Sequence, residues 1–458
     1  MTSSPLFLRV WPGCEMAVPT TTDHLTGWVL YEQGRWFESE ITLLPKLLEP
    51  GATFVDVGAN LGVYSMIAAH VVGSSGRVVA FEPTPQARSL LEAAKERNGF
   101  TGLVIRPEAL ADRIGEADLF FDAQTELASL SKSTSGTTKS IRVPLTTLDA
   151  VHAEMDLSAT TLIKLDAEGA EESILRGAGE FLRASDPVIL HEIKVGTSVD
   201  LRVANILAEM GYAPYRHLPG LDILVPFVLT GFVDPYQLNL FGVSASRADK
   251  LARRGVLAEK LGQSLTLTLE LGTQRLARLP YARHLASAWS GSASADKHLW
   301  MLLALHAFAH EELHAAADRW AALEKALTLA LDRVNERATV PRLLTATRLA
   351  AETGMRGLAV RTVRDALQLL RSGKTNLLDE PFLMPDATFD AARPAGPVEG
   401  LVFAAALRAH ERLRAFSSFF TGVEALEDLR FSALLGYSEG EMSRRLELVT
   451  QRASRVSR

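Results

Sequence analysis

One stretch decides the fold: residues 54–64, which run Phe54-Val55-Asp56-Val57-Gly58-Ala59-Asn60-Leu61-Gly62-Val63-Tyr64. Its first four residues form a short, mostly apolar run, which is long enough for a buried strand and too short for a helix. A glycine-rich turn follows, and residues 61–71 then carry apolar side chains at helical spacing. A strand, a glycine turn and a helix in this order present backbone N–H groups and a helix N-terminus to a ligand. Gly58 and Gly62 let the backbone bend sharply and approach that ligand closely.

A second parallel strand is predicted where Val78-Val79-Ala80-Phe81-Glu82-Pro83 ends in a carboxylate, 20 residues after Gly62. An acidic side chain at this place can accept hydrogen bonds from both hydroxyls of a ribose. The two strands together therefore indicate a nucleoside ligand.

Two cofactors contain such a nucleoside. A dinucleotide site favours the spacing G-x-G-x-x-G, whereas the glycines here are spaced G-x-x-x-G and Asp56 precedes the first of them by two residues. That carboxylate would repel a pyrophosphate but suits a sulfonium and an α-amino group. The pattern favours S-adenosylmethionine (SAM) over NAD. The alternative is a glycine-rich turn that binds no ligand.

Length and composition narrow the class of protein. A chain of 458 residues predicts two or three domains, and 47% hydrophobic with 22% charged residues is typical of a soluble globular protein. The single cysteine, Cys14, excludes an intramolecular disulfide and a cysteine-based zinc site, and it suits a reducing cytoplasm. We expect no signal peptide and no membrane span, since no long uncharged apolar run is present.

Charge is distributed unevenly along the chain. Residues 1–240 carry 18 basic and 30 acidic side chains, a net charge of −12, and residues 241–458 carry 30 basic and 24 acidic ones, a net charge of +6. This change predicts either electrostatic docking between the two halves or an anionic partner for the second half. Neither half is basic enough to indicate nucleic-acid binding.

Residues 1–50 are expected to form a lead-in with short strands at 6–11 and 27–30 and a helix over 36–48. Glu38 follows two aromatic residues and is a candidate to lean over the cofactor pocket. A solvated carboxylate at a helix start is the alternative interpretation.

The segment after the second strand predicts the adenine environment. Residues 86–97 have the pattern of an amphipathic helix, and residues 103–105 that of a third strand. Ala109 and Leu110 follow that strand, and we expect them to flank the adenine, with Asp112 as an acceptor. Residues 118–122 and 141–145 are predicted to pair around a loop, 129–140, whose composition suggests mobility.

Acidic residues gather at the ends of two further predicted strands. Asp166, Glu168 and Glu171 follow the apolar run at 161–165, and His191 and Glu192 follow Val188-Ile189-Leu190. Clustered acids are costly there unless a cation or an array of donors meets them. Open α/β sheets bind ligands at this end of their strands.

The motifs, taken together, resemble the FkbM family of SAM-dependent methyltransferases over roughly residues 35–243. They occur in the family's order: Asp56-Val57-Gly58-Ala59-Asn60-Leu61-Gly62, Phe81-Glu82-Pro83, Thr147-Leu148-Asp149 and Ile163-Lys164-Leu165-Asp166-Ala167-Glu168-Gly169-Ala170-Glu171. The resemblance implies a seven-stranded, Rossmann-like class I methyltransferase domain, here residues 51–243. It also implies an acceptor hydroxyl on a sugar, glycan or natural product. The residues we expect at the cofactor are Glu38, Asp56, Gly58, Ala59, Asn60, Gly62, Tyr64, Glu82, Pro83, Ala109, Leu110 and Asp166.

Methyl transfer from a sulfonium is an in-line displacement, so the protein must align acceptor, methyl group and sulfur. An alcohol acceptor also loses a proton, and the candidate catalytic residues are His191, Glu192, Asp166 and Glu168. His191 is the best base by residue type, although a structural histidine is the alternative. Asp166 is expected at the methionine amino group, with Glu168 or Glu192 holding a substrate hydroxyl. A Mg²⁺ site formed by the three carboxylates is a further alternative.

Residues 244–458 predict an all-α domain that resembles helical repeats. Gly354, Ala359, Val363 and Ala366 have the spacing at which tetratricopeptide-like hairpins place small residues for close helix contact. We expect this domain to bind the substrate or a protein partner. A loop is expected over 375–397. Helices are predicted at 248–261, 273–288, 296–333, 341–371, 400–420 and 441–452, of which the third and fourth spans are long enough to be helix pairs.

The sequence His310-Glu311-Glu312-Leu313-His314 matches H-E-x-x-H, which on a helix can bind zinc, and His306 extends the same face. No third ligand occurs at a familiar spacing. The motif is therefore interpreted as a packed or solvated face of a repeat helix, and no metal site is predicted.

The leading hypothesis is a cytoplasmic SAM-dependent O-methyltransferase that acts on a small-molecule or glycan acceptor. An N-methyltransferase, and a helical interaction scaffold with an auxiliary SAM-binding domain, are the alternatives. No nucleic-acid partner is expected.

Overall fold

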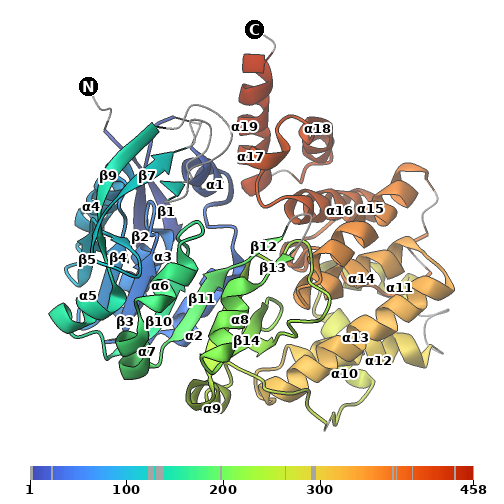
Figure 1. The fold of residues 1–458 in the computed structure, drawn as a ribbon. Coiled ribbons are helices and arrows are strands. Elements are labelled where there is room, and N and C mark those ends of the chain that lie inside the picture. Colours follow the sequence, from blue (N-terminus) through green and yellow to red (C-terminus); the bar gives the residue numbers. More distant parts are fainter. Residues whose placement is uncertain are drawn as a thin grey trace. The chain divides into compact units, whose positions relative to one another are not determined.

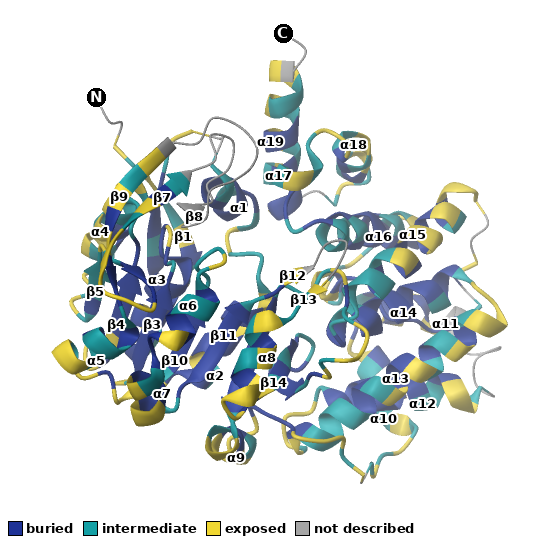
Figure 2. Cartoon of the chain, viewed as in Figure 1, coloured by how far each residue is buried: buried dark blue, intermediate teal, exposed yellow. Residues whose placement is uncertain are grey.

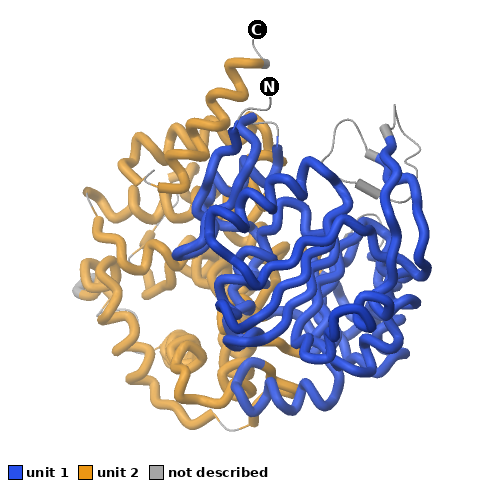
Figure 3. Tube along the Cα trace, turned by 90° about the vertical axis from the view of Figure 1, so that its left-hand side faces the viewer, with its two compact units in different colours: residues 1–217, 226–233, 237–256 blue, residues 218–225, 234–236, 257–458 orange. Residues whose placement is uncertain are grey.

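The computed structural model (Figure 1) describes residues 4–21, 24–121, 128–129, 139–195, 199–263, 265–289, 296–373, 376–377, 379–394, 396–437 and 440–456. Most of the predicted loop at 129–140 lies outside these ranges. The chain divides into two compact units, coloured in Figure 3. The first unit holds residues 1–217, 226–233 and 237–256, and the second holds 218–225, 234–236 and 257–458. Residues 244–256 thus belong to the first unit, whereas the sequence placed the boundary after residue 243.

A mixed sheet forms the centre of the first unit, with strand order β15-β14-β16-β11-β10-β3-β4-β5. Five neighbouring strands are parallel, as expected for runs that are apolar along their whole length. They are β5 (Leu103–Arg106), β4 (Arg77–Phe81), β3 (Thr53–Val57), β10 (Thr160–Leu165) and β11 (Val188–Glu192). An antiparallel pair, β16 (Asn239–Ser244) and β14 (Tyr212–Leu218), extends the sheet beyond β11, and β15 spans Ile223–Pro226. The predicted α/β class I fold is confirmed.

Alternation along the strands separates the two faces of this sheet. Val55, Val57 and Leu165 pack into a core with helices α5 (Leu148–Met155), α6 (Glu171–Arg176), α7 (Gly179–Ser185) and α8 (Arg202–Glu209). Asp56 points to the opposite face, where α3 (Val63–Val72) lies. Ser65 of that helix donates a hydrogen bond to its carboxylate. Helix α4 (Pro85–Asn98) packs on β5. Figure 2 shows the central strands buried.

The lead-in differs from the prediction at two places. Residues 27–30 belong to helix α1 (Leu25–Gln33), in which Trp28 Nε1 donates to Glu32 Oε2 four residues on and Gly34 ends the helix in a left-handed conformation. The expected helix over 36–48 is a 3₁₀ helix, Ser39–Leu43, followed by α2 (Leu44–Leu47). The first expected strand is confirmed as β1 (Leu6–Trp11), which pairs with β2 (Cys14–Val18).

Smaller elements complete the first unit. A four-stranded sheet has the order β6-β9-β7-β8, and its pairing of β7 with β9 confirms the predicted hairpin-like pair. These strands are β6 (Ala109–Leu110), β7 (Gly115–Phe121), β8 (Ala128–Ser129) and β9 (Lys139–Thr146). The remaining elements are β12 (Lys194–Val195), β13 (Val199–Asp200) and α9 (Ala245–Arg253).

The second unit is helical around one large apolar core. The two long predicted spans are helix pairs, as expected, and each helix from α12 to α15 packs on the next helix in the sequence. The described helices are α10 (Glu270–Ala277), α11 (Pro280–Trp289), α12 (Lys297–Ala309), α13 (Ala316–Glu336), α14 (Val340–Glu352), α15 (Arg356–Arg371), α16 (Val398–Arg414), α17 (Ser418–Thr421), α18 (Leu426–Leu434) and α19 (Glu441–Val456). A short 3₁₀ helix, Ala387–Phe389, interrupts the expected loop.

Small side chains set the contact between α14 and α15. Gly354 makes the turn with a positive φ of 78°, and Ala359 and Ala366 of α15 are completely buried. Thr347 and Thr362 share a hydrogen bond of 2.9 Å between the two helices.

In the described part of the chain, none of the helices has the length and apolar character that a membrane crossing requires.

Candidate active site

The turn after β3 is built around a close backbone approach. Gly58 has φ +76°, and a Cβ atom at this position would lie 1.8 Å from the backbone oxygen of Asp166. The amides of Gly58 and Ala59 both donate to the backbone oxygen of Phe81, at 3.1 and 3.0 Å. At Gly62, with φ +89°, a Cβ would lie 2.1 Å from Leu91 Cδ1. Both glycines of the G-x-x-x-G spacing are therefore required sterically.

Glu82 holds the loops that follow β3 and β4. Its Oε2 accepts from the Asn60 amide at 2.7 Å, and its Oε1 accepts from the Thr84 amide at 2.7 Å. Burial raises the pKa of Glu82 despite these bonds. Arg88 donates to the backbone oxygens of Glu82 and Pro83 and fixes the beginning of α4. The Thr84 side chain also hydrogen-bonds this carboxylate. A carboxylate has about four lone-pair sites, so a site remains available to a ligand hydroxyl.

Asp56 is a buried carboxylate on the α3 face of the sheet. Its Oδ2 accepts from Ser65 Oγ at 2.6 Å, while its Oδ1 is buried and has no hydrogen-bond partner among the described residues. Burial raises its pKa. The paired residue on β10 is Lys164, whose positive charge opposes that shift.

Lys164 is a further functional candidate. It lies within the motif that begins at Ile163, but no role was predicted for it. Its Nζ lies 2.6 Å from Asp166 Oδ2 and 5.0 Å from the centroid of the Tyr64 ring. The Tyr64 hydroxyl donates to Glu38 Oε2 at 2.5 Å. Burial disfavours the ammonium, but three neighbouring carboxylates, those of Asp166, Asp56 and Glu38, outweigh that penalty and raise the pKa of Lys164. A lysine inside an apolar strand run was the signal that could have identified it.

Three carboxylates converge at the ends of β10 and β11. Oxygens of Asp166, Glu168 and Glu192 lie within 4.8 Å of one another. Burial raises the pKa of Glu192 from 4.5 to about 8, and the other two carboxylates add to the shift. Glu192 Oε2 is buried and has no hydrogen-bond partner among the described residues, whereas Lys194 Nζ pairs with Glu168 Oε2 at 3.1 Å. The group therefore contains one carboxylate, that of Glu192, which is protonated more readily than an ordinary glutamate.

The structure does not bring His191 to this group. His191 and Glu192 are consecutive on β11, so their side chains lie on opposite faces of the sheet. His191 is 1% exposed and is in register with Leu165, and its Nδ1 lies 3.2 Å from the backbone oxygen of Glu192. Burial lowers the pKa of its imidazole to about 4.

The residues expected at the adenine lie on strand β6. Ala109 and Leu110 are both buried, and they pair with β9 in parallel. The Asp112 amide donates to Ser173 Oγ at 3.1 Å.

The Thr147-Leu148-Asp149 motif makes contacts that hold helices in place. Thr147 caps α5, and Asp149 Oδ1 accepts from the Phe181 amide at 2.8 Å.

The strand order, the glycine turn after β3 and the acid after β4 define a class I methyltransferase domain. Residues 56–214 match the family model described as the methyltransferase FkbM domain, and this part of the chain belongs to that family. The match confirms the predicted family, and with it the predicted class of enzyme for this domain, a SAM-dependent methyltransferase.

Known proteins match only part of the chain. A ribosomal protein L11 methyltransferase from Pelotomaculum thermopropionicum is 38% identical over 81 residues, which are 17% of this chain and 26% of that protein. The structure of an FkbM methyltransferase from Methylobacillus flagellatus superimposes with a TM-score of 0.32 and 18% identity, covering 45% of this chain and 48% of the other. A SAM-dependent O-methyltransferase from Thermotoga maritima has a TM-score of 0.27 and 15% identity, covering 45% and 64%. The chain thus spans about a quarter of the curated relative and about half of the first of these structures.

Proposed function

We propose that the first unit binds SAM beside the turn between β3 and α3 and methylates a hydroxyl on a small molecule or glycan. The observation that carries this proposal is the Glu82 carboxylate, which orders the turn through the Asn60 amide and keeps a lone pair for a ribose hydroxyl. Membership of residues 56–214 in the FkbM family supports it.

The residues around the turn fit SAM in charge. The cofactor, when bound, supplies a methyl group on a positively charged sulfur. Asp56, Asp166 and Glu38 place negative charge around Lys164, and this arrangement suits a ligand that carries both an ammonium and a carboxylate. We propose Asp166 for the amino group and Tyr64 with Glu38 as the wall of the pocket. Ala109 and Leu110 stay the predicted contacts of the adenine.

We propose Glu192 as the general base that accepts the proton of the acceptor hydroxyl. A base works best when its pKa lies near the working pH, and burial brings that of Glu192 to about 8. Its unpaired Oε2 is free to accept a hydrogen bond from the acceptor. His191, whose pKa is lowered to about 4, stays a predicted base that the same experiment tests. Glu168 or Glu192 was predicted to hold a substrate hydroxyl, and with Glu192 as the base we propose Glu168 for that contact.

Two measurements test this function. Calorimetry of the full chain with SAM and with NAD should show binding of SAM alone, and Glu82→Ala should abolish it. Transfer of a labelled methyl group onto a fractionated bacterial extract then identifies the acceptor. Glu192→Gln should lower the transfer rate about 100-fold or more, while His191→Asn should keep most of it.

The outcomes separate the alternatives. Absence of SAM binding to the intact chain contradicts the proposal, and binding of SAM without transfer to any fraction favours the interaction scaffold. Loss of activity in His191→Asn with an unchanged Glu192→Gln would move the base to His191. Label on nitrogen in the product would replace the hydroxyl acceptor by an amine.

A further inference from the structure

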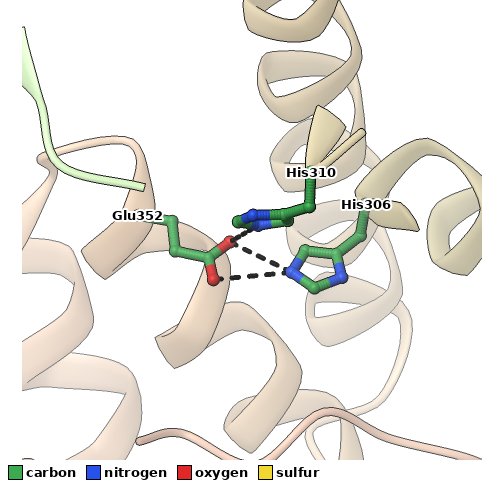
Figure 4. A group of neighbouring side chains, drawn as sticks. All are labelled: His306, His310 and Glu352. Atoms are coloured by element: carbon green, nitrogen blue, oxygen red, sulfur yellow. Dashed lines mark hydrogen bonds and ion pairs between the residues drawn. The ribbon is translucent and has the colours of Figure 1, made fainter. Parts of the chain in front are cut away.

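Two histidines and a glutamate meet inside the second unit (Figure 4). His306 lies in the last turn of α12, His310 directly follows that helix, and Glu352 is the last residue of α14. One ring nitrogen of each histidine and a carboxylate oxygen lie within 4.8 Å of one another. The side chains point toward one another from two helices that are 46 residues apart in sequence at the His306–Glu352 contact.

One carboxylate oxygen is shared between the rings. Glu352 Oε2 lies 3.1 Å from His306 Nε2 and 3.2 Å from His310 Nε2. Tetrahedral ligands at zinc–nitrogen distances of 2.0–2.1 Å are separated from each other by about 3.3 Å. Both distances between the carboxylate oxygen and an imidazole nitrogen are therefore close to the spacing of ligands around one ion.

Neighbouring residues hold the glutamate in this orientation. Arg348 donates through Nε to Oε1, the oxygen that turns away from His310, and its other nitrogens pair with Asp390 at 3.2 and 3.0 Å. The Gly220 amide donates to the backbone oxygen of Glu352 at 2.8 Å, and a Cβ at Gly220 would lie 2.5 Å from Glu352 Cβ. Outer partners of this kind fix the direction of metal ligands.

We propose that His306 Nε2, His310 Nε2 and Glu352 Oε2 bind one Zn²⁺ ion. Two imidazoles and a carboxylate are a ligand set that zinc accepts with a fourth position open to water or a further ligand. His310 is 23% exposed at its side chain and His306 1%, so the open position lies on the His310 side. The ion links the end of α12 to the last turn of α14. The site lies wholly within the second unit and does not depend on the proposed methyl transfer.

This site shares only His310 with the H-E-x-x-H motif noted in the sequence. Residues 310–314 are not helical, because α12 ends at Ala309, and this corrects the expectation that they form a face of a repeat helix. His314 stacks on Phe308 with ring centroids 3.8 Å apart and pairs with Glu311. The glutamate that joins the two histidines comes instead from α14.

The test is zinc binding to the full chain. Protein dialysed against a chelator is titrated with Zn²⁺ in competition with a chromophoric chelator, and bound zinc is quantified by mass spectrometry. We expect one zinc per chain, a higher melting temperature with zinc, and an intense visible band of tetrahedral Co²⁺ on substitution. His310→Ala and Glu352→Gln should weaken binding about 100-fold or more, since each removes a ligand.

His314→Ala and His298→Ala are the matched controls, because both histidines are on or next to α12 and outside the proposed ligand set. Both should bind zinc like the parent. Circular dichroism checks folding. If the variant of the buried Glu352 does not fold, His310→Ala alone tests the site, since His310 is partly exposed. The proposal is overturned if the parent retains no zinc, if His310→Ala binds with unchanged affinity, or if His314→Ala abolishes binding.

Discussion

Lys164 Nζ lies 2.6 Å from Asp166 Oδ2, and the lysine side chain is only 7% exposed. Lys164 lies on β10, in register with the buried Asp56 on the neighbouring strand β3. A buried charge without a partner is strongly destabilising, so the ammonium compensates the carboxylates that the proposed SAM site requires.

Lys164→Met should therefore lower the free energy of unfolding by about 2–4 kcal/mol, because it leaves buried carboxylates uncompensated. Lys194→Met is the matched control. Its pair with Glu168 is exposed, with the lysine side chain 55% exposed, and its loss should cost about 0.5 kcal/mol or less. Urea unfolding measures both, and an equal loss in the two variants would contradict the assignment.

Gly58→Ala should destabilise the first unit by at least about 2 kcal/mol, because the added methyl would overlap the Asp166 backbone oxygen in addition to the positive φ. Gly99→Ala separates these causes, since Gly99 has φ +68° with nothing within 4 Å of a Cβ. Its cost should be about 1 kcal/mol. Thermal unfolding compares the two, and similar losses would show that the close approach is not tight in solution.

Glu82→Gln should weaken SAM binding at least about tenfold. The amide NH₂ group would face a backbone N–H, either of Asn60 or of Thr84, and the charge-assisted bonds would be lost. Calorimetry measures the affinity. Glu92→Gln, on the exposed surface of α4, should bind SAM like the parent. Unchanged affinity of Glu82→Gln would remove the basis of the proposed cofactor site.

Stability should fall as the pH rises from about 4.5 to about 8 because of Glu192. Its folded-state pKa is raised, so the native chain holds a proton in this window that the unfolded chain has released, and the free energy of unfolding decreases with pH. Glu192→Gln removes this contribution. Its unfolding free energy, measured by urea titration at several pH values, should rise relative to that of the parent as the pH increases. A constant difference across the window contradicts the shift.

The raised pKa of Glu192 also predicts a pH dependence of methyl transfer. A base must be deprotonated, so the transfer rate should rise with pH and level off above about 8. The rate at saturating SAM, followed across this range, measures it. A rate that levels off near pH 4 would assign the proton transfer to His191 instead.

Local sequence patterns were sufficient for much of the first unit. The apolar runs that became β3, β4, β10 and β11 and the G-x-x-x-G spacing depend on residues close in the chain, and periodicity reveals them. Residues 27–30 were misassigned because their weak alternation is also compatible with the helix that Trp28 and Glu32 stabilise. Short apolar runs without flanking turn residues are ambiguous in this way.

Contacts between distant residues were decided by the tertiary structure. Asp56 lies beside Lys164 only because β3 and β10 are neighbours in the sheet. His191 and Glu192 are neighbours in sequence, but their side chains lie on opposite faces of the sheet because successive residues of a strand alternate. His306 and Glu352 meet only because helices pack around a shared core, which no local pattern encodes. The amino-acid sequence determined the class of domain and the residue types at its nucleoside turn. The packing of strands and helices decided which of those side chains share a site, because proximity in the fold depends on burial of the whole apolar surface rather than on spacing along the chain.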